Sequence, residues 1–531
     1  MMNTNSTLIA FISAIMLCVS TATAQEQVEQ WGRFEATLAG TPTGNPFVDA
    51  DLRATFSNGE EQITVNGFYD GDKGYKIRFM PQKTGTWSYT TRSNMKSLDN
   101  QSGSFECIPA TGNNHGMVGV RNTWDFGYAD GTPYYPFGTT MYAFVHPNME
   151  REEQTLKTLS ESPFNKIRIC VFPKTYDNNN NEPRYFPFLK IEGAVPDSLN
   201  NNVAVWDFTR FDTDFFRHLE RRIDDLDRLG IQCDLILFHP YDEGHFGFDR
   251  MTRSSDLNYV RYLVARLASF RNIWWSLANE WDFLKAKTTD DWDAILKTVA
   301  ESDPYGHLVS NHNGKIYTNY HHPLITHCSI QNESACEEFG RAGLVKDSYR
   351  KPVVFDEICY EGNYPNRWGS LSGEELTFRF WQAAIVGTYA THGEVFTSAD
   401  HIAWTEKGAI LRGTSAPRIG FLRKLIEQTG SLKIIDNWRY LNIAKAEKGQ
   451  VVIYLGKEKL KEWAFMVPTR TAWANGTKVK VEVLDTWNMT TTEVKDVFVT
   501  ERKQYEINDV NMRKVKLPGK PYMALVLTVV E

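Results

Sequence analysis

The sequence predicts a multidomain protein in which a (β/α)8 TIM barrel lies between two β-sandwiches. The chain has 531 residues, which is too long for one ordinary domain. Its middle part alternates apolar strands with amphipathic helices many times over. The segments before and after it alternate polar and apolar residues with a period of two. We therefore expect one barrel and two flanking sandwiches.

Residues 1–24 predict a secretory signal peptide. The apolar run from Leu8 to Val19 is too short to span a bilayer, and Ala22-Thr23-Ala24 forms a small-residue cleavage pattern. The segment MMNTNST departs from the usual pattern because it carries no Lys or Arg. No other run is long and apolar enough to predict a membrane helix. We expect an exported protein, periplasmic or extracellular, with no membrane span.

The two flanking regions, residues 25–115 and 437–531, are predicted to be β-sandwiches. In both, short alternating segments are separated by Gly, Asn and Asp at the spacing of sandwich turns. Examples are DLRATFSN, YKIRFMP and GTWSYTTRS in the first region, and QVVIYLG, KVKVEVLDTW and YMALVLTVV in the second.

Residues 120–432 are predicted to form the barrel. The clearest helix is FDTDFFRHLERRIDDLDRLG, whose apolar residues share one stripe. Eight strands over this length fit a (β/α)8 barrel. An open doubly wound sheet is the alternative, which the absence of a Gly-rich loop after the first strand disfavours. The eight predicted strands are YYPFGTTMY, NKIRICVFP, IQCDLILFHP, NIWWSLANE, HLVSNHN, ITHCSIQ, PVVFDEICY and EVFTSADHIAW.

Charge and composition reduce the number of function classes that the chain could belong to. A net charge of -7 and a pI near 6.0 argue against a nucleic-acid surface. His321, His322 and His327 have no carboxylate or Cys set at ligand spacing, so we expect neither a metal nor a cofactor. The six cysteines after Cys18 match no zinc pattern and are expected to be free thiols. The sequence does not indicate an oligomeric state.

Two glutamates, Glu280 and Glu357, each close an apolar strand, in NIWWSLANE and PVVFDE. A carboxylate is costly to bury without a partner. Barrel active sites form at the carboxyl ends of the strands, where these two residues are expected to meet. Glycoside hydrolysis needs such a pair, one protonated to give a proton to the leaving oxygen and one ionised to attack the anomeric carbon.

Strand alternation predicts where the carboxylates point. If Glu280 faces the barrel interior, so do Ala278 and Ser276, whose small side chains suit a crowded interior. In the later strand the same argument directs Glu357 inward and Asp356 towards the helices. We therefore expect Asp356 to form a salt bridge or a helix cap rather than to react.

Polar or aromatic residues near the ends of most other strands complete the predicted site. Asn279 could hold a sugar hydroxyl, Arg168 could keep the nucleophile ionised, and Trp404 could stack on a sugar ring. The candidate residues have plain structural interpretations as well. Arg168 could form an internal ion pair, and His239 could form a structural hydrogen bond. The residues expected to bind substrate are Arg168, His239, Tyr241, Asn279, His312, Gln331 and Trp404.

These residues resemble clan A of the glycoside hydrolases, whose barrels carry Asn-Glu after strand four and Glu after strand seven. The segments LFHPYDEGHFGF, IWWSLANEWDF and KPVVFDEICYEGNYPNRWGSLSGEEL are similar to the apiosidase-like barrel family of exported bacterial proteins. The resemblance implies an immunoglobulin-like (Ig-like) first domain, a C-terminal sandwich, Glu280 as acid/base and Glu357 as nucleophile. Ser329-Ile330-Gln331 departs from the clan, where many members carry an aromatic residue or His.

We therefore expect a retaining, exo-acting glycoside hydrolase that acts on an oligosaccharide or on polysaccharide side chains. The loop EGNYPNRWGSLSG after Glu357 favours a pocket over an open groove. Two alternatives stay open. One is a non-catalytic carbohydrate-binding barrel. The other is a polysaccharide lyase that uses Tyr241 and His239.

Overall fold

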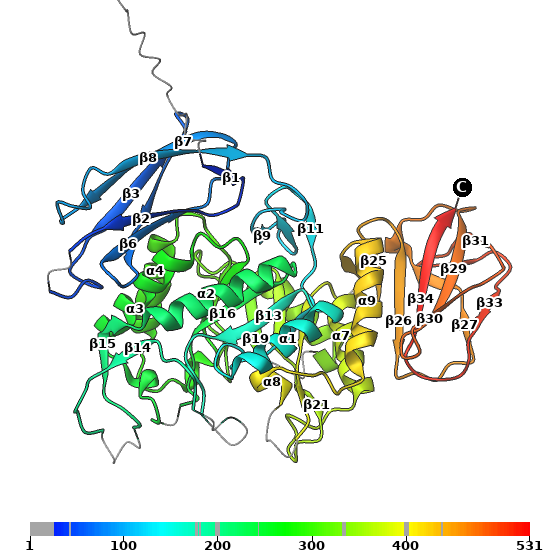
Figure 1. Ribbon diagram of the computed structural model, residues 1–531. Helices are drawn as coiled ribbons and strands as arrows, with labels where there is room; N and C mark the ends of the chain where they lie inside the picture. Colours follow the sequence, from blue (N-terminus) through cyan, green and yellow to red (C-terminus); the bar gives the residue numbers. More distant parts are fainter. Residues whose placement is uncertain are drawn as a thin grey trace, which may run out of the picture.

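The computed structural model describes residues 26–530, except 42–43, 176–178, 180–181, 197–201, 243, 332–335, 398–402 and 437–438. Figure 1 shows a central barrel with a sheet domain at each end of the chain. This arrangement confirms the predicted fold class. The predicted signal peptide lies outside the described residues. Among the described residues, no helix is long and apolar enough to cross a bilayer.

The N-terminal domain packs two β-sheets face to face. One has the order β1-β8-β7-β3-β4 and the other the order β2-β6-β5. Alternate residues point into a shared aromatic core, where Phe34 stacks on Phe105 and Phe56 on Phe79, with ring centroids 4.4 and 4.2 Å apart. The strands are Gln27–Glu29 (β1), Phe34–Ala39 (β2), Leu52–Ser57 (β3), Gln62–Asn66 (β4), Phe68–Tyr69 (β5), Gly74–Phe79 (β6), Gly85–Ser93 (β7) and Ser102–Ile108 (β8).

Eight parallel strands form the barrel, in the order β18-β17-β16-β13-β12-β22-β20-β19. Hydrogen bonds from Thr326 N to Val309 O and from Ser310 Oγ to His327 O bridge the gap between β18 and β19. The strands are Gly138–Thr140 (β12), Lys166–Cys170 (β13), Gln232–Phe238 (β16), Ile273–Ala278 (β17), Val309–Ser310 (β18), Cys328–Gln331 (β19), Val353–Glu357 (β20) and Tyr389–His392 (β22).

The eighth barrel strand was predicted too late in the chain. The prediction was EVFTSADHIAW, but β22 (Tyr389–His392) is the strand that pairs with both β12 and β20. Of the predicted segment, only β23 (Glu394–Val395) is a described strand, and it pairs with β21 (Glu361–Gly362) just beyond the carboxyl ends of β20 and β22. The segment YATH looks like the tail of the preceding helix because no apolar run marks it.

Helices surround the barrel, and several of them begin at a residue whose side chain caps the helix. Asp212 caps α2 by accepting hydrogen bonds from two backbone amides, and Thr288 and Asp291 form a capping box on α4. The hairpin β14–β15 adds a small sheet. The elements are Met149–Glu161 (α1), Phe188–Lys190 (β14), Trp206–Phe211 (β15), Thr213–Arg228 (α2), Arg253–Leu267 (α3), Thr289–Ser302 (α4), Phe339–Tyr349 (α6), Gly373–Ile385 (α7), Trp404–Lys407 (α8) and Ser415–Thr429 (α9).

A small sheet covers the amino-terminal end of the barrel. It contains β9 (Val118–Val120), β10 (Phe126–Tyr128) and β11 (Pro133–Tyr134). Phe126 packs against Trp274 of β17, with ring centroids 5.1 Å apart. The N-terminal domain lies on this side of the barrel in Figure 1, whereas α8 and β21 lie on the opposite side. The carboxyl-end face of the barrel is therefore left uncovered by that domain.

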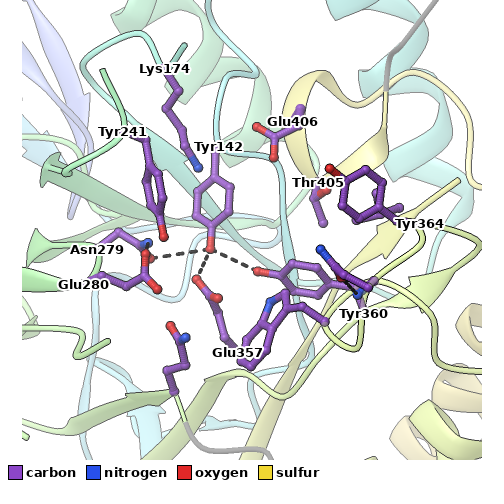
Figure 2. Close-up of a pocket in the computed structure, with 15 residues that line it drawn as sticks. Tyr142, Lys174, Tyr241, Asn279, Glu280, Glu357, Tyr360, Tyr364, Thr405 and Glu406 are labelled. Carbon is purple, nitrogen blue, oxygen red and sulfur yellow. Dashed lines mark hydrogen bonds between the residues drawn. The ribbon is translucent and has the colours of Figure 1, made fainter. Parts of the chain in front are cut away.

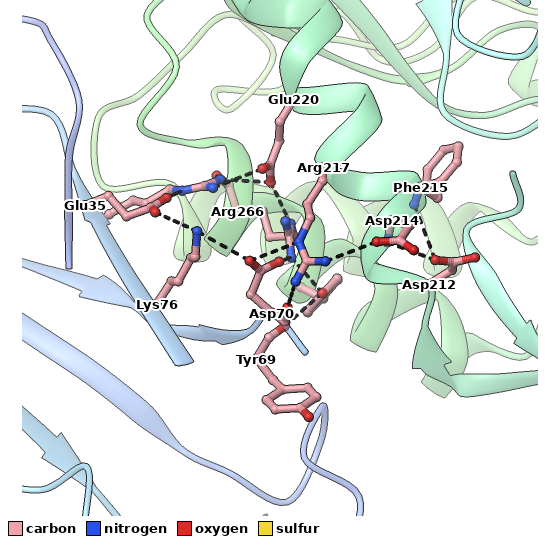
Figure 3. Close-up of polar contacts among 12 residues, drawn as sticks. Glu35, Tyr69, Asp70, Lys76, Asp212, Asp214, Phe215, Arg217, Glu220 and Arg266 are labelled. Atoms are coloured by element: carbon pink, nitrogen blue, oxygen red, sulfur yellow. Dashed lines mark hydrogen bonds and ion pairs between the residues drawn. The ribbon is translucent and has the colours of Figure 1, made fainter. Parts of the chain in front are cut away.

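A buried ion-pair network fixes the N-terminal domain to helices α2 and α3 (Figure 3). Glu220 of α2 accepts hydrogen bonds from Arg78 of β6 at 2.9 Å and from Arg266 of α3 at 2.6 Å. Arg266 also donates to Asp70 at 2.7 Å. Burial opposes ionisation of Glu220, but the two arginines outweigh it and lower its pKa to about 2. These groups stay charged and hold the two domains in one orientation.

The C-terminal domain is an antiparallel sheet domain packed against helix α7. Trp381 of α7 stacks on Tyr454 of β26, with ring centroids 5.0 Å apart. The main sheet has the order β24-β25-β26-β34-β29-β31-β32-β28. The strands are Leu432–Asp436 (β24), Tyr440–Ala446 (β25), Val451–Gly456 (β26), Glu462–Ala464 (β27), Met466–Pro468 (β28), Lys478–Asp485 (β29), Thr490–Glu493 (β30), Phe498–Arg502 (β31), Glu506–Asp509 (β32), Lys514–Lys516 (β33) and Met523–Val530 (β34).

Candidate active site

A cavity of about 340 Å³ opens at the carboxyl ends of the barrel strands (Figure 2). Both predicted carboxylates, Glu280 and Glu357, line it. Its wall combines aromatic side chains with converging charged and amide groups, and the polar share is high for a small-molecule site. The lining residues are Tyr142, Lys174, Tyr241, Asn279, Glu280, Gln331, Glu357, Tyr360, Tyr364, Asn366, Trp368, Gly369, Val395, Thr405 and Glu406.

Glu280 reaches the cavity from just beyond the end of its strand. β17 ends at Ala278, and Glu280 has φ 50° and ψ 55°, in the left-handed region. This backbone turn, rather than strand alternation, sets the direction of the side chain. A non-glycine residue in this conformation is strained, and such strain is concentrated at functional sites. Asp282 anchors the loop by accepting hydrogen bonds from the amides of Gly314 and Lys315, at 2.6 and 2.8 Å.

Glu357 ends β20, and a β-bulge brings it to the cavity. Ile330 of β19 pairs with Phe355, and Gln331 pairs with Glu357, so that Asp356 is an extra residue on β20. Because of this extra residue, strict alternation does not hold at the end of the strand. Glu357 faces the cavity, as expected, but for a different reason.

The predicted direction of Asp356 is wrong. Its Oδ1 accepts hydrogen bonds from Lys166 of β13 at 2.7 Å and from Thr391 of β22 at 2.8 Å, and its Oδ2 accepts one from Ser329 of β19 at 2.5 Å. β12 and β22 separate β13 from β20, so the contact with Lys166 crosses the barrel interior. Asp356 therefore points inward, and only the predicted salt bridge agrees with the structure.

Positive and donor groups surround Glu357. Arg168 Nη1 lies 3.8 Å and His312 Nε2 3.6 Å from Glu357 Oε1, and the hydroxyl of Tyr142 donates a hydrogen bond to the same oxygen. Burial opposes ionisation of Glu357, but His312 and Arg168 outweigh it and lower its pKa to about 2. Glu357 is therefore ionised at neutral pH.

Glu280 lies in the opposite kind of environment. It is 4% exposed, and its Oε2 accepts a 3.3 Å hydrogen bond from Asn279. Burial, and then the negative charge of Glu357, raise the pKa of Glu280 to about 8, against smaller opposing effects from Lys174 and Gln331. Tyr142 links the two carboxylates through Asn279. Its hydroxyl bonds to Glu357 and lies 3.5 Å from Asn279 Oδ1, and Asn279 in turn donates to Glu280. Figure 2 shows Glu280 and Glu357 facing the same space.

The other predicted substrate-binding residues divide into two groups. Tyr241, Asn279 and Gln331 line the cavity. Arg168 and His312 do not line it; they are fully buried behind Glu357, where they act on its charge. Arg168 therefore lies where it can keep Glu357 ionised, as the sequence suggested, although neither residue lines the space where a substrate would bind.

His239 and Trp404 are placed differently from the prediction. The His239 ring donates from Nε2 to Phe172 O at 3.0 Å and accepts at Nδ1 from Tyr241 N at 3.1 Å, so both nitrogens are engaged. Burial lowers the pKa of His239 to about 3 and keeps it neutral. Trp404 is 2% exposed at the start of α8, and its Nε1 donates to Thr139. Neither residue presents a face to the cavity.

Sequence reasoning missed several residues of the cavity wall. Lys174 lies over the rings of Tyr142 and Tyr241, at 3.6 and 4.4 Å from their centroids. Tyr360 follows Glu357 closely and contacts the hydroxyl of Tyr142 at 3.2 Å. Trp368 lies in the loop that the sequence singled out as forming a pocket. The other lining residues that were not predicted as site residues are Tyr142, Tyr364, Asn366, Gly369, Val395, Thr405 and Glu406.

Within the described part of the chain, one group of His and Glu side chains lies close enough to share a metal ion. It contains Glu361, His392 and Glu394, none of which lines the cavity. This group does not include His321, His322 or His327, around which the sequence showed no other residues at ligand spacing.

An eight-stranded barrel with Asn-Glu just after its fourth strand and Glu at the end of its seventh has the arrangement of a glycoside hydrolase, as the resemblance to clan A implied. Family comparison gives a particular assignment: residues 121–430 match the apiosidase-like catalytic domain, and the chain belongs to this family. Residues 27–94 match a domain of unknown function, DUF5060, and residues 435–528 match another, DUF5605.

Solved structures agree with this assignment. The crystal structure of "a putative glycoside hydrolase from Bacteroides vulgatus ATCC 8482" is 44% identical, covering 95% of this chain and 100% of that one, with a TM-score of 0.93. A family 5 glycoside hydrolase from the same organism is 12% identical over 79% of this chain and 94% of its own, with a TM-score of 0.54, and supports the fold alone. No curated protein matches the chain.

Proposed function

We propose that this glycoside hydrolase is a retaining enzyme in which Glu280 is the general acid/base and Glu357 the nucleophile. The observation that supports this most is the contrast between two carboxylates on one cavity. Glu280 is buried beside a like charge, whereas Glu357 lies beside Arg168 and His312. One carboxyl is thus protonated and the other ionised, which are the states that the first step needs.

In the first step, Glu280 donates its proton to the glycosidic oxygen as the bond from this oxygen to the anomeric carbon breaks. Glu357 attacks the anomeric carbon and forms a covalent glycosyl-enzyme. In the second step, Glu280, now a carboxylate, takes a proton from water as the water oxygen displaces Glu357. Tyr142 orients Glu357 through its hydrogen bond to Oε1, and Asn279 can hold a hydroxyl of the sugar.

The shape of the cavity supports exo action on side chains of complex polysaccharides. Its volume of about 340 Å³ lies at the small end of ligand sites. Tyr360, Tyr364 and Trp368 belong to one cluster in the lining of the cavity and can offer aromatic faces to a sugar ring. A pocket of this kind suits a single terminal sugar. The predicted signal peptide, residues 1–24, supports export to the periplasm or beyond.

A screen of aryl pentosides and hexosides, furanose and pyranose, tests this function. We expect hydrolysis of one sugar type, with the first-formed product in the anomeric configuration of the substrate when the reaction is followed by ¹H NMR. The opposite anomer would indicate inversion and remove the nucleophile role of Glu357. Sugar binding without turnover would favour the non-catalytic alternative. An ultraviolet-absorbing product from uronic-acid polymers would favour a lyase.

Glu280→Gln should lower kcat/KM by about 10²–10⁴-fold on natural glycosides, because the amide cannot donate the proton. The loss on glycosides of nitrophenols should be much smaller for the first step, because nitrophenolate departs without protonation. Burst kinetics should then show the glycosyl-enzyme accumulating. Glu301→Gln, an exposed position on α4, is the control for the substitution itself. An equal loss on both types of leaving group would contradict the acid/base role.

The activity should depend on pH with a broad, bell-shaped profile. The acidic limb should follow the titration of Glu357 and lie far below neutrality, because its pKa is lowered to about 2. The alkaline limb should follow the loss of the Glu280 proton near pH 8. Measurement of kcat/KM against pH checks both limbs. An alkaline limb that persists in Glu280→Gln would assign it to another group.

A further inference from the structure

A second group of buried acidic residues lies beside the cavity wall and outside the reaction. Glu361 of β21 pairs directly with Glu394 of β23 in a parallel sheet, so their side chains lie next to each other. The two are 3% and 1% exposed, and His392, at the end of β22, is fully buried. One ligand atom from each of the three residues lies within 4.8 Å of the others.

Part of this group has a plain structural explanation. Glu361 accepts hydrogen bonds from the amides of Thr414 and Ser415 at 2.6 and 3.0 Å, at the start of α9. Glu394 accepts from the amides of Arg412 and Gly413 at 2.6 and 2.8 Å. The carboxylates thus fix the loop that enters α9. Amide dipoles carry only partial charges, and Arg412, whose charge also acts on Glu394, is exposed, so the two adjacent buried carboxylates are only partly compensated.

His392 is the feature that loop anchoring does not explain. Its Nδ1 lies 2.9 Å from the hydroxyl of Thr139, which also accepts a hydrogen bond from Trp404. Its Nε2 is buried, has no hydrogen-bond partner among the described residues, and lies 3.9 Å from Glu394 Oε2. An Nδ1–H that donates to Thr139 leaves a free lone pair on Nε2, the nitrogen that lies beside Glu394. Metal-binding histidines are held by such a hydrogen bond.

The space around the group can hold an ion. A cavity of about 150 Å³ adjoins Glu394. A Cβ at Gly413 would lie 2.5 Å from both Glu361 Oε2 and Glu394 Oε2, so the glycine keeps open the space between the two carboxylates. Zn²⁺ binds His nitrogen and carboxylate oxygen at about 2.0–2.2 Å, so the three side chains would have to move closer together to bind it.

We propose that Glu361, His392 and Glu394 form a structural binding site for one divalent transition-metal ion of the Zn²⁺ class. One imidazole and two carboxylates are ligands that favour such an ion over Ca²⁺ or Mg²⁺, and water from the adjoining cavity can complete the coordination. Two negative charges balance the ion. Tyr360 and Val395, the neighbours of Glu361 and Glu394, line the substrate cavity, so the ion positions that wall.

Metal content tests the site without any measurement of activity. The full chain is dialysed against EDTA, equilibrated with Zn²⁺, freed of excess metal and analysed by mass spectrometry. We expect one Zn²⁺ per chain and a Tm that rises by about 2–4 °C or more with Zn²⁺. His392→Gln and Glu394→Gln should lose both the bound ion and the Tm shift.

His327→Gln is the matched control. His327 is equally buried, its Nδ1 also lies near a threonine hydroxyl, and its Nε2 has no described partner, but it lies outside the group. This variant should retain Zn²⁺. Equal Zn²⁺ content in the parent and in Glu394→Gln, or a parent Tm that does not change with Zn²⁺, would overturn the proposed metal site. This holds even if His392→Gln fails to fold. Retention of Ca²⁺ when both ions are offered would overturn the choice of ion.

Discussion

Glu357→Gln should lower kcat/KM by about 10⁴-fold or more on every substrate, whatever its leaving group. An amide cannot form the glycosyl-enzyme, so the first step fails even when the leaving group needs no proton. Glutamine keeps the shape of the side chain and an oxygen that can accept from Tyr142. Folding should therefore be preserved, which circular dichroism and thermal unfolding will show.

The comparison with Glu280→Gln separates the two roles. The acid/base variant should retain much of its activity in the first step on nitrophenyl glycosides, whereas the nucleophile variant should not. Glu357→Ala offers a third measurement, because it leaves space for azide. Azide should attack the anomeric carbon in place of the carboxylate, release the aryl alcohol and yield a glycosyl azide of inverted configuration. Activity of Glu357→Gln within tenfold of the parent would end the assignment.

The charge of Glu357 also links the two carboxylates. That charge is one cause of the raised pKa of Glu280, after burial. Neutralising Glu357 should therefore lower the pKa of Glu280, although burial keeps it above the ordinary glutamate value. NMR titration of labelled carboxyl groups in Glu357→Gln can follow this change. An unchanged pKa would mean that the two groups lie too far apart to act on one bond.

The fold could be predicted because hydrophobic periodicity changes clearly along the chain. The period of two in the flanking regions and the apolar strands of the barrel each have a direct physical cause in burial. The eighth barrel strand escaped because YATH contains no apolar run and follows α7 after a short turn. Polar barrel residues such as Thr391, which contacts Asp356, give a strand no hydrophobic signal.

The two carboxylates of the cavity could be predicted from the sequence, for reasons that only partly agree with the structure. Glu280 was predicted to end the strand, but Asn279 and Glu280 lie just beyond β17, and a left-handed turn directs Glu280. Alternation failed in β20 because a bulge adds one residue, and nothing in PVVFDE marks a bulge. Tyr364 and Trp368 lie on a loop, where no periodicity relates sequence to position. Long-range contacts set the site, and a single sequence does not report them.

Asp356→Asn should lower the free energy of unfolding of the barrel by about 3–5 kcal/mol, because it breaks a buried ion pair and leaves a charge behind. Lys166 Nζ lies 2.7 Å from Asp356 and 2.6 Å from Asp234, and both it and Asp356 are fully buried. Asp234 and Asp356 both lie near Lys166 and Arg168, so the loss of the Asp356 charge leaves only Asp234 of these two carboxylates to balance them. Denaturant unfolding followed by intrinsic fluorescence measures the change.

The effect of Asp356→Asn should depend on pH with a defined sign. Lys166 and Arg168 outweigh the cost of burial and hold the pKa of Asp356 well below its ordinary value. A lowered folded-state pKa gives stability that is present above the unfolded value, about 3.9, and is lost as the pH falls below it. The difference between parent and variant should therefore be constant at neutral pH and shrink below about pH 4.

A double-mutant cycle with Lys166→Gln distinguishes an ion-pair role from a catalytic one. Asn at 356 and Gln at 166 together remove both charges, so the double variant should be more stable than the sum of the two single losses predicts. Asp356→Asn should leave kcat unchanged if Arg168 keeps its position beside Glu357. A large loss of kcat with unchanged stability would instead mean that Asp356, and not Glu357, is the catalytic carboxylate of β20.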